Sequence, residues 1–253
     1  MRVAVAGGTG LVGRYVVEEL ATAGQEPVVL SRSHGVDLVT GTGLDSAMAG
    51  VEAVIDVSNL TTTSSKKAIS FFDSVSRNLL EVGERAGVSH YVLLSIVGID
   101  RVGLGYYQGK LRQEEVVKSG RTPWTVLRAT QFHEFAEQTL DRVPKPLAVA
   151  PWMRTQPVAA REVAQHLVQL VLAPPQGMAP ELAGPRVEQV VDMVGRLLRA
   201  RLQRRLLPVK LPGATGAAMT GDGQLPTGLG PRGSQTFDEW LAQHVTRQTV
   251  RGG

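Results

Sequence analysis

The sequence predicts an α/β fold, a doubly wound parallel sheet with a small C-terminal lobe. Short apolar runs rich in β-branched residues alternate with helical patterns through about residue 150, as expected for a parallel sheet covered by helices. Beyond that point the alternation ends, and amphipathic helices are separated by segments rich in glycine and proline. We therefore expect residues 1–150 to form one domain and residues 151–253 to form a lobe interleaved with its sheet.

The chain begins MRVAVAGGTGLVG, which reads as a strand, a glycine turn and the start of a helix. In this context Gly7 permits a tight turn, Gly10 lets the backbone approach a pyrophosphate, and Gly13 lets the helix pack against the strand. The spacing fits GxGxxG from Gly8 and GxxGxxG from Gly7. It predicts a Rossmann-type dinucleotide site, the alternative being a tight turn without a ligand. The expected contacts in this turn are Gly7, Thr9, Gly10, Leu11, Val12 and Gly13.

The residues after the second predicted strand, 27–30, bear on the choice of nucleotide. An acidic side chain there would bind the ribose 2′-hydroxyl of NAD(H), whereas an arginine would accept the 2′-phosphate of NADP(H). The sequence reads Ser31, Arg32, Ser33, with no acid before Asp37. This predicts NADP(H) rather than NAD(H), with Arg32 and a neighbouring serine on the phosphate. The alternative is an exposed loop arginine without a ligand.

The third predicted strand, 51–59, ends in polar residues. Ligands of such sheets lie over the carboxyl ends of the strands, so Val57, Ser58 and Asn59 are expected to border the nucleotide. The alternative is a polar cap on the strand, because serine and asparagine favour such turns.

A helix from about residue 66 to 82 and a strand at 90–95 follow, and the strand ends at Ser95. Tyr106 and Lys110 share one face of the next helix, since they lie four residues apart. A nearby ammonium lowers the pKa of a phenol, which can then exchange a proton with a carbonyl oxygen held by the serine hydroxyl. We predict Tyr106 as acid/base, Ser95 as oxygen anchor and Lys110 as both pKa tuner and ribose ligand. In the alternative, the tyrosines pack on the core and Lys110 binds only ribose.

These segments together resemble the short-chain dehydrogenase/reductase superfamily, and more narrowly its atypical, NmrA-like branch. The resemblance rests on AGGTGLVG, Ser95, YYQGK and WTVLRATQFHEF and continues through QPVAAREVAQHL, ELAGP and TFDEWL. It implies a Rossmann fold with a C-terminal substrate-capping lobe and NADP(H) as cofactor. It places Gly7, Gly10 and Gly13 on the pyrophosphate, Arg32 on the 2′-phosphate and Lys110 on the ribose. Some members of this branch act as nucleotide sensors, but the presence of Tyr106 and Lys110 favours an enzyme.

The fifth predicted strand, 123–130, leads into Thr130, Gln131, Phe132 and His133 at the same sheet edge. Thr130 and Phe132 are expected beside the nicotinamide, and His133 is either a substrate contact or an ordinary polar residue. Farther on, ELAGP at 181–185 is expected to form a short strand and turn, and residues 212–234 a loop or loosely held helix. A last helix should begin after Thr236, with Glu239 completing a capping box.

Composition excludes several other classes of function. The chain has no cysteine, and its five histidines lack metal-ligand spacing, so we expect no metal. Arginines cluster at 196–205, but no aromatic residues interleave with them, so a solvated helix face is preferred to a nucleic-acid site. No signal peptide or bilayer-spanning run is evident, which predicts a cytoplasmic protein without a membrane partner. We expect either a monomer or a homodimer.

The sequence thus predicts an NADP(H)-dependent oxidoreductase that reduces a carbonyl or quinone-like small molecule. Two alternatives stay open: a non-catalytic NADP(H)-sensing regulator, and a non-redox member of the superfamily such as an epimerase or dehydratase.

Overall fold

The computed structural model describes residues 1–141, 147–201 and 205–251. The chain folds as two compact units. The first comprises residues 1–128 and 160–180, and the second comprises residues 129–159 and the chain from Glu181 onward. The chain therefore leaves the first unit and returns to it. The division at residue 150 into a cofactor domain and a substrate lobe stays a prediction.

The first unit is built on a six-stranded parallel sheet in the order β2-β1-β3-β4-β5-β8, which confirms the predicted fold class. Strand β1 pairs in parallel with β2 on one side and β3 on the other, so that Val5 is opposite both Val29 and Ile55. The strands are β1 (Arg2–Ala6), β2 (Glu26–Leu30), β3 (Ala53–Asp56), β4 (His90–Ile96), β5 (Trp124–Ala129) and β8 (Gly177–Met178).

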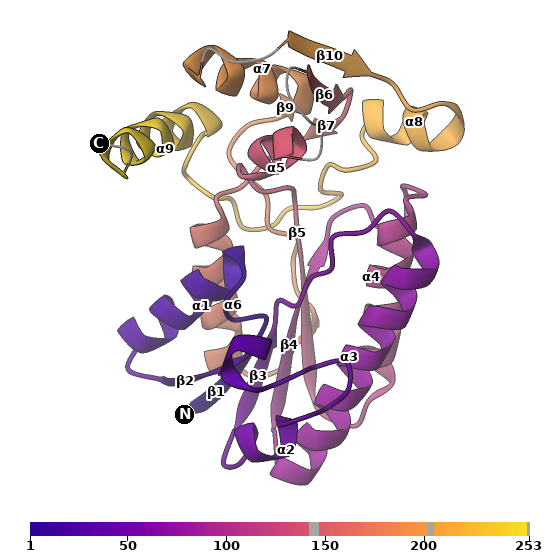
Figure 1. Cartoon of the computed structure of the whole chain (residues 1–253). Coiled ribbons are helices and arrows are strands. Elements are labelled where there is room, and N and C mark those ends of the chain that lie inside the picture. The colour runs from indigo at the N-terminus through magenta and orange to yellow at the C-terminus, as the bar shows by residue number, and fades with distance from the viewer. Residues whose placement is uncertain (142–146, 202–204, 252–253) are drawn as a thin grey trace. The chain divides into compact units, whose positions relative to one another are not determined.

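Helices cover both faces of this sheet (Figure 1). On one face α1 (Leu11–Thr22) packs against α6 (Ala160–Leu172), and on the other α3 (Ser65–Ala86) packs against α4 (Gly105–Ser119). A single 3-10 turn, η1 (Arg32–His34), and the short helix α2 (Leu44–Ala47) lie between β2 and β3. The core between sheet and helices is apolar and fully buried, as illustrated by Val5, Leu20, Ile55, Phe72 and Leu93.

The order of the strands fixes where a ligand can lie. The chain runs from β1 outward to β2 and then returns to the other side of β1 as β3, so the connections leave β1 in opposite directions. Such a switch point opens a crevice at the carboxyl ends of the two strands. The glycine turn after β1 and residues 57–59 after β3 both stand at this point.

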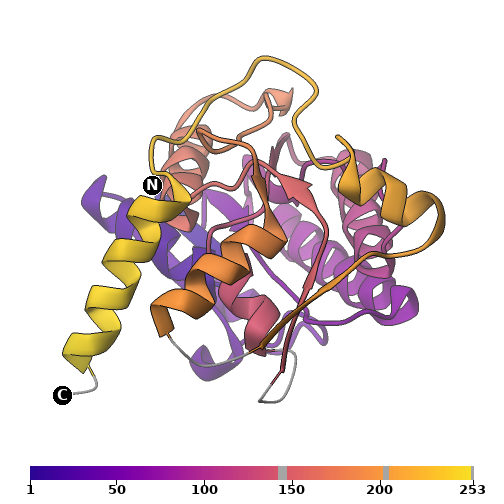
Figure 2. The same ribbon diagram turned by 90° about the horizontal axis from the view of Figure 1, so that it is seen from above.

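The second unit contains two small two-stranded sheets and four helices in its described residues. Strand β6 (Leu147–Pro151) runs parallel to β10 (Arg205–Val209), and α7 (Val190–Arg201) packs against both, as Figure 2 shows from above. The remaining elements are α5 (Phe135–Asp141), β7 (Arg154–Thr155), β9 (Glu188–Gln189), α8 (Gly213–Thr220) and α9 (Phe237–Arg251), with β7 and β9 antiparallel.

Several local predictions can be compared with this unit. The capping box is confirmed: the Thr236 amide donates to the Glu239 carboxylate at 2.8 Å, and the Glu239 amide donates to Thr236 Oγ1 at 3.3 Å. The predicted strand at 181–185 is wrong, because Leu182 and Ala183 form only isolated bridges, and β8 is the last strand of the large sheet. Helix α5 was not predicted.

The arginine cluster at 196–205 falls mainly on α7. Arg196 is neutralised there, because its guanidinium pairs with Glu188 at 2.5 Å and with Asp238 at 2.8 Å. Arg204 lies outside the described residues. In the described parts of the chain no helix is both long enough and apolar enough to cross a bilayer.

Candidate functional site

The glycine turn after β1 has a geometry that only glycine permits. Gly7 adopts a φ of +79°, in the left-handed region that side chains disfavour. Gly13 is held against the same turn, since a Cβ there would lie 2.1 Å from the Gly7 carbonyl oxygen. The turn therefore brings bare backbone to the switch point, as an approaching phosphate requires.

Helix α1 begins at this turn without a cap of its own. Gly10 is the N-cap and offers no side chain, and no acidic residue lies in the first turn. The Arg14 amide donates to the Gly10 carbonyl at 3.1 Å. The amides of Leu11, Val12 and Gly13 precede it, where a helix has no carbonyl to receive them. These amides and the positive end of the helix dipole suit an anion.

The end of β3 contributes an unsatisfied hydroxyl. Asp56 Oδ1 accepts the Ser58 amide at 2.9 Å and fixes the turn that follows the strand. Ser58 itself is buried, and its Oγ has no hydrogen-bond partner among the described residues. A buried hydroxyl without a partner is costly, so this atom indicates a ligand that completes it. With the glycine turn, it shows that the residues present fit a nucleotide.

The end of β2 presents the residues expected to choose the nucleotide. Arg32 and Ser33 are exposed and Ser31 is half-buried. The acid of this loop, Asp37, is turned away, because its Oδ1 accepts the amides of Val39 at 2.8 Å and Thr40 at 3.1 Å. These backbone hydrogen bonds, that from Thr40 most of all, hold the pKa of Asp37 below its ordinary value.

Tyr106 lies half-buried at the start of α4 and reaches the end of β3. Its hydroxyl donates to Asn59 Oδ1 at 2.7 Å. The ring packs edge-on against Phe72, with 5.7 Å between the centroids. The phenol is therefore held beside the residue that follows the open Ser58 hydroxyl.

Lys110 is turned into the interior. Its Nζ donates to the Leu94 carbonyl at 2.7 Å and to Gln113 Oε1, and it lies 4.8 Å from the Phe72 ring centroid. Burial lowers the pKa of Lys110 to about 8, an effect that the charges of Asp56 and Glu114 partly offset. The hydrogen bonds of this ammonium thus go to the core, and Phe72 contacts both Lys110 and the Tyr106 ring.

Gln113 links Lys110 to a buried carboxylate. Its Nε2 donates to Asp56 Oδ2 at 2.8 Å, and the Tyr91 hydroxyl donates to the same oxygen at 2.7 Å. Burial first, and then the Asp56 charge, raise the pKa of Tyr91 well above its ordinary value. The Gln113 amide therefore bridges Lys110 and Asp56, a link that the sequence reasoning missed.

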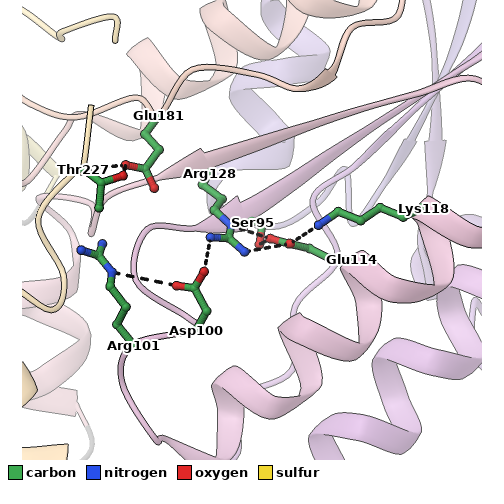
Figure 3. A network of polar contacts seen from close by, with 8 residues as sticks. All are labelled: Ser95, Asp100, Arg101, Glu114, Lys118, Arg128, Glu181 and Thr227. Atoms are coloured by element: carbon green, nitrogen blue, oxygen red, sulfur yellow. Dashed lines mark hydrogen bonds and ion pairs between the residues drawn. The ribbon is translucent and has the colours of Figure 1, made fainter. Parts of the chain in front are cut away.

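Ser95 belongs to a different buried network, shown in Figure 3. Its hydroxyl donates to Glu114 Oε1 at 2.6 Å. The same carboxylate accepts both Arg128 Nε at 2.9 Å and Arg128 Nη2 at 3.0 Å, as well as Lys118 Nζ at 2.8 Å. Arg128 also pairs with Asp100 at 2.9 Å. The hydroxyl hydrogen of Ser95 is thus used inside the protein.

Electrostatics keep this network ionised. Burial raises the pKa of Glu114, but hydrogen bonds from Arg128, Lys118 and Ser95 outweigh it, so the pKa lies below its ordinary value. Sequence reasoning missed Glu114 and Arg128. The signal available was a charged residue inside the otherwise apolar strand WTVLRA.

The residues expected beside the nicotinamide belong to the second unit. Thr130 is buried, and its hydroxyl donates to the Gln156 carbonyl at 2.6 Å. Phe132 forms a bridge with Val158. His133 is buried against the Trp240 ring, at 6.0 Å between centroids. Nucleotide contacts by Thr130 and Phe132 stay predictions.

In the described part of the chain, no three acidic or histidine side chains gather closely enough to hold a metal ion.

The family model for NAD(P)H-binding proteins matches residues 7–174. The chain belongs to this NAD(P)H-binding family. The match begins at the glycine turn and extends past α6, so it includes strands β2 to β5 but begins just after β1.

One curated relative and two solved structures are similar to the chain. A (4-alkanoyl-5-oxo-2,5-dihydrofuran-3-yl)methyl phosphate reductase of Streptomyces griseus subsp. griseus is 29% identical over 142 residues, which are 51% of this chain and 47% of that protein. The chain thus matches about half the length of this relative.

A short-chain dehydrogenase/reductase superfamily protein from Agrobacterium tumefaciens with bound NAD is similar in fold (TM-score 0.70, 17% identity, 99% of this chain and 98% of that one). The Escherichia coli NADPH-dependent quinone oxidoreductase QOR2 with NADPH is equally similar (TM-score 0.70, 17% identity, 96% of this chain and 99% of that one).

The family match confirms the predicted relationship to NAD(P)H-binding proteins, and the two solved structures confirm the predicted fold. Membership of the atypical, NmrA-like branch stays a prediction. The curated relative bears the name of a reductase, and QOR2 bears that of an oxidoreductase. The matching proteins include one bound to NAD and one bound to NADPH, so the nucleotide preference is not decided by similarity.

Proposed function

We propose that the protein is an NADP(H)-dependent oxidoreductase that reduces a carbonyl or quinone-like small molecule, with Tyr106 as the proton donor. The observation that carries the proposal is the Tyr106–Asn59 hydrogen bond of 2.7 Å. This hydrogen bond holds the ionisable Tyr106 hydroxyl at the end of β3, close in sequence to the buried Ser58 hydroxyl that has no hydrogen-bond partner among the described residues.

The chain's own residues account for binding and for the proton. The amides of the α1 N-terminus bind the pyrophosphate, Ser58 binds a ribose hydroxyl, and the loop after β2 binds the 2′-phosphate. When bound, the nicotinamide supplies the hydride. Tyr106 then releases its hydrogen bond to Asn59 and donates its proton to the substrate oxygen as that oxygen gains negative charge.

Lys110 and Ser95 need a modified assignment within this proposal. The Lys110 ammonium favours the Tyr106 phenolate through space across Phe72, rather than through a direct hydrogen bond. While the Ser95 hydroxyl donates its hydrogen bond to Glu114, its oxygen can only accept a hydrogen bond from the substrate. Oxygen anchoring by Ser95 and ribose binding by Lys110 therefore require these side chains to exchange partners.

The preference for NADP(H) rests on the loop after β2. Arg32 is exposed there, and Asp37, the acid that could otherwise receive a ribose hydroxyl, is engaged by two backbone amides. A cytoplasmic location and a monomeric or homodimeric state stay predictions.

Turnover of a panel of quinones and carbonyl compounds with NADPH tests the proposal. Tyr106→Phe should lower kcat by about 100-fold or more, the usual contribution of a positioned acid, with little change in NADPH affinity. Tyr107→Phe, which removes the neighbouring hydroxyl, is the matched control and should retain turnover. Full activity of Tyr106→Phe would refute the assigned role.

A nucleotide-sensing regulator is the second candidate, and one specific observation favours it. Both Ser95 and Lys110 direct their hydrogen bonds into the interior, to Glu114, Leu94 and Gln113. A sensor would bind NADPH tightly, turn over no member of the panel, and bind a protein partner with an affinity that depends on the nucleotide.

A further inference from the structure

We propose that His34 is a specificity-determining residue for the nucleotide. In this view His34 acts with Ser31, Arg32 and Ser33 on the phosphate monoester that distinguishes NADPH from NADH. The inference rests on the proposed function, because it requires a nucleotide at the switch point between β1 and β3.

The position of His34 is fixed by the turn that carries it. The Gly7 amide donates to the Leu30 carbonyl at 3.1 Å, which ties the end of β2 to the glycine turn. The next residues form η1, in which the His34 amide donates to the Ser31 carbonyl at 2.9 Å. Gly35, at a φ of +75°, then ends the turn. The side chains of residues 31–34 therefore gather at the strand end that faces an adenosine ribose in this kind of fold.

Three polar side chains converge in this turn. Ser31 Oγ lies 2.8 Å from His34 Nδ1 and 3.0 Å from Ser33 Oγ, and Ser33 Oγ lies 3.2 Å from the same nitrogen. Each of these groups is open enough to be satisfied by water, yet they point toward one another. The imidazole and the two hydroxyls thus gather at one place, where each hydroxyl can turn its hydrogen from its present partner toward an arriving acceptor.

The charges of the loop select an anion at this place. Arg32 contributes an exposed guanidinium, and the Asp37 carboxylate is occupied by the amides of Val39 and Thr40. A phosphate monoester offers three strong acceptor oxygens, which match two hydroxyls, a guanidinium and an imidazole N–H. The ribose hydroxyl of NADH carries no charge and gains little from the same groups. His34 should therefore affect NADPH alone.

Dissociation constants for NADPH and NADH, measured by calorimetry, test the inference. His34→Ala should weaken NADPH binding about fivefold, the upper end for an exposed contact with a charged phosphate, and leave NADH binding unchanged. His34→Asn should restore most of the loss, because an amide can occupy the position of Nδ1. Thr42→Ala is the control, since it removes a hydroxyl of the same loop that bonds Thr40 instead.

The fragments 2′,5′-ADP and 5′-AMP give a second readout without the nicotinamide, and the variants should change affinity only for the first. An unchanged NADPH/NADH ratio in His34→Ala, together with a lowered ratio in Arg32→Ala, would overturn the role of His34 and leave the proposed function intact. An equal loss for both nucleotides would also overturn it, because it would mean a general effect on the loop. A wild-type protein without NADPH preference would refute the proposed cofactor as well.

Discussion

Replacing Gly13 with alanine perturbs the glycine turn at its tightest point. The new Cβ would lie 2.1 Å from the Gly7 carbonyl oxygen and 2.7 Å from the Gly8 Cα. Real Cβ contacts stay beyond 3.0 Å, so the backbone would have to move by about 0.9 Å. Overpacking of this kind costs about 1–3 kcal/mol, and here backbone rather than a flexible side chain must yield.

Helix propensity works in the opposite direction. Alanine is favoured over glycine within a helix by about 1 kcal/mol, so the clash must be separated from this gain. Gly83→Ala in α3 is the matched control, because Gly83 is also helical and buried. A Cβ added there would meet only a Val88 methyl, at 3.4 Å, as its nearest atom. We expect Gly13→Ala to be less stable than Gly83→Ala by about 2 kcal/mol or more in free energy of unfolding.

Thermal and denaturant unfolding of both variants, together with titration with NADPH, provide the assay. Gly13→Ala should melt about 5 °C or more below Gly83→Ala and lose most of its nucleotide affinity, because the displaced turn misplaces the α1 amides. If Gly13→Ala matched the wild type in both stability and NADPH affinity, the reasoning from the turn would be refuted.

Two further predictions concern the buried ionic groups. Glu114→Gln should lower the free energy of unfolding by about 3 kcal/mol, because Arg128 and Lys118 lose the carboxylate charge that both pair with. The control Glu115→Gln, which removes the exposed ion pair with Arg112, should cost well under 1 kcal/mol, and denaturant unfolding measures both. The folded-state pKa of Glu114 is depressed, so its stabilisation is present above about pH 4.5 and is lost as the pH falls; equal acid sensitivity of wild type and Glu114→Gln would contradict this. The pKa of Lys110 is about 8 in the folded chain and 10.5 ordinarily, so between these values the unfolded state holds more protons and stability should rise with pH by up to about 1.4 kcal/mol per unit. Lys110→Met should abolish that rise, and a Lys110→Met curve parallel to the wild type would show that burial does not shift this group.

The elements with strong local signals were predictable from the sequence. The glycine turn, strands β1 to β5 and the Thr236 capping box each depend on residues within a few positions of one another, whereas β8 was not predicted. Helix α5 was missed because its residues follow a predicted strand end and carry no cap signal.

The directions of side chains in the candidate site were not predictable in the same way. Tyr106 and Lys110 lie on one face of α4 by spacing, but Lys110 turns inward because Gln113 connects it to Asp56, a residue 57 positions from Gln113. Ser95 is likewise drawn to Glu114, 19 positions away, which Arg128 holds from the next strand. Such choices depend on partners that only the folded chain brings together.

Calorimetric titration of the wild-type protein with NADPH tests most directly whether the βα junction after β1 binds a nucleotide diphosphate. The account predicts one saturable site per chain, weakened in Gly13→Ala and in Ser58→Ala. Absence of binding by both NADPH and NADH, in a protein shown to be folded, would contradict it.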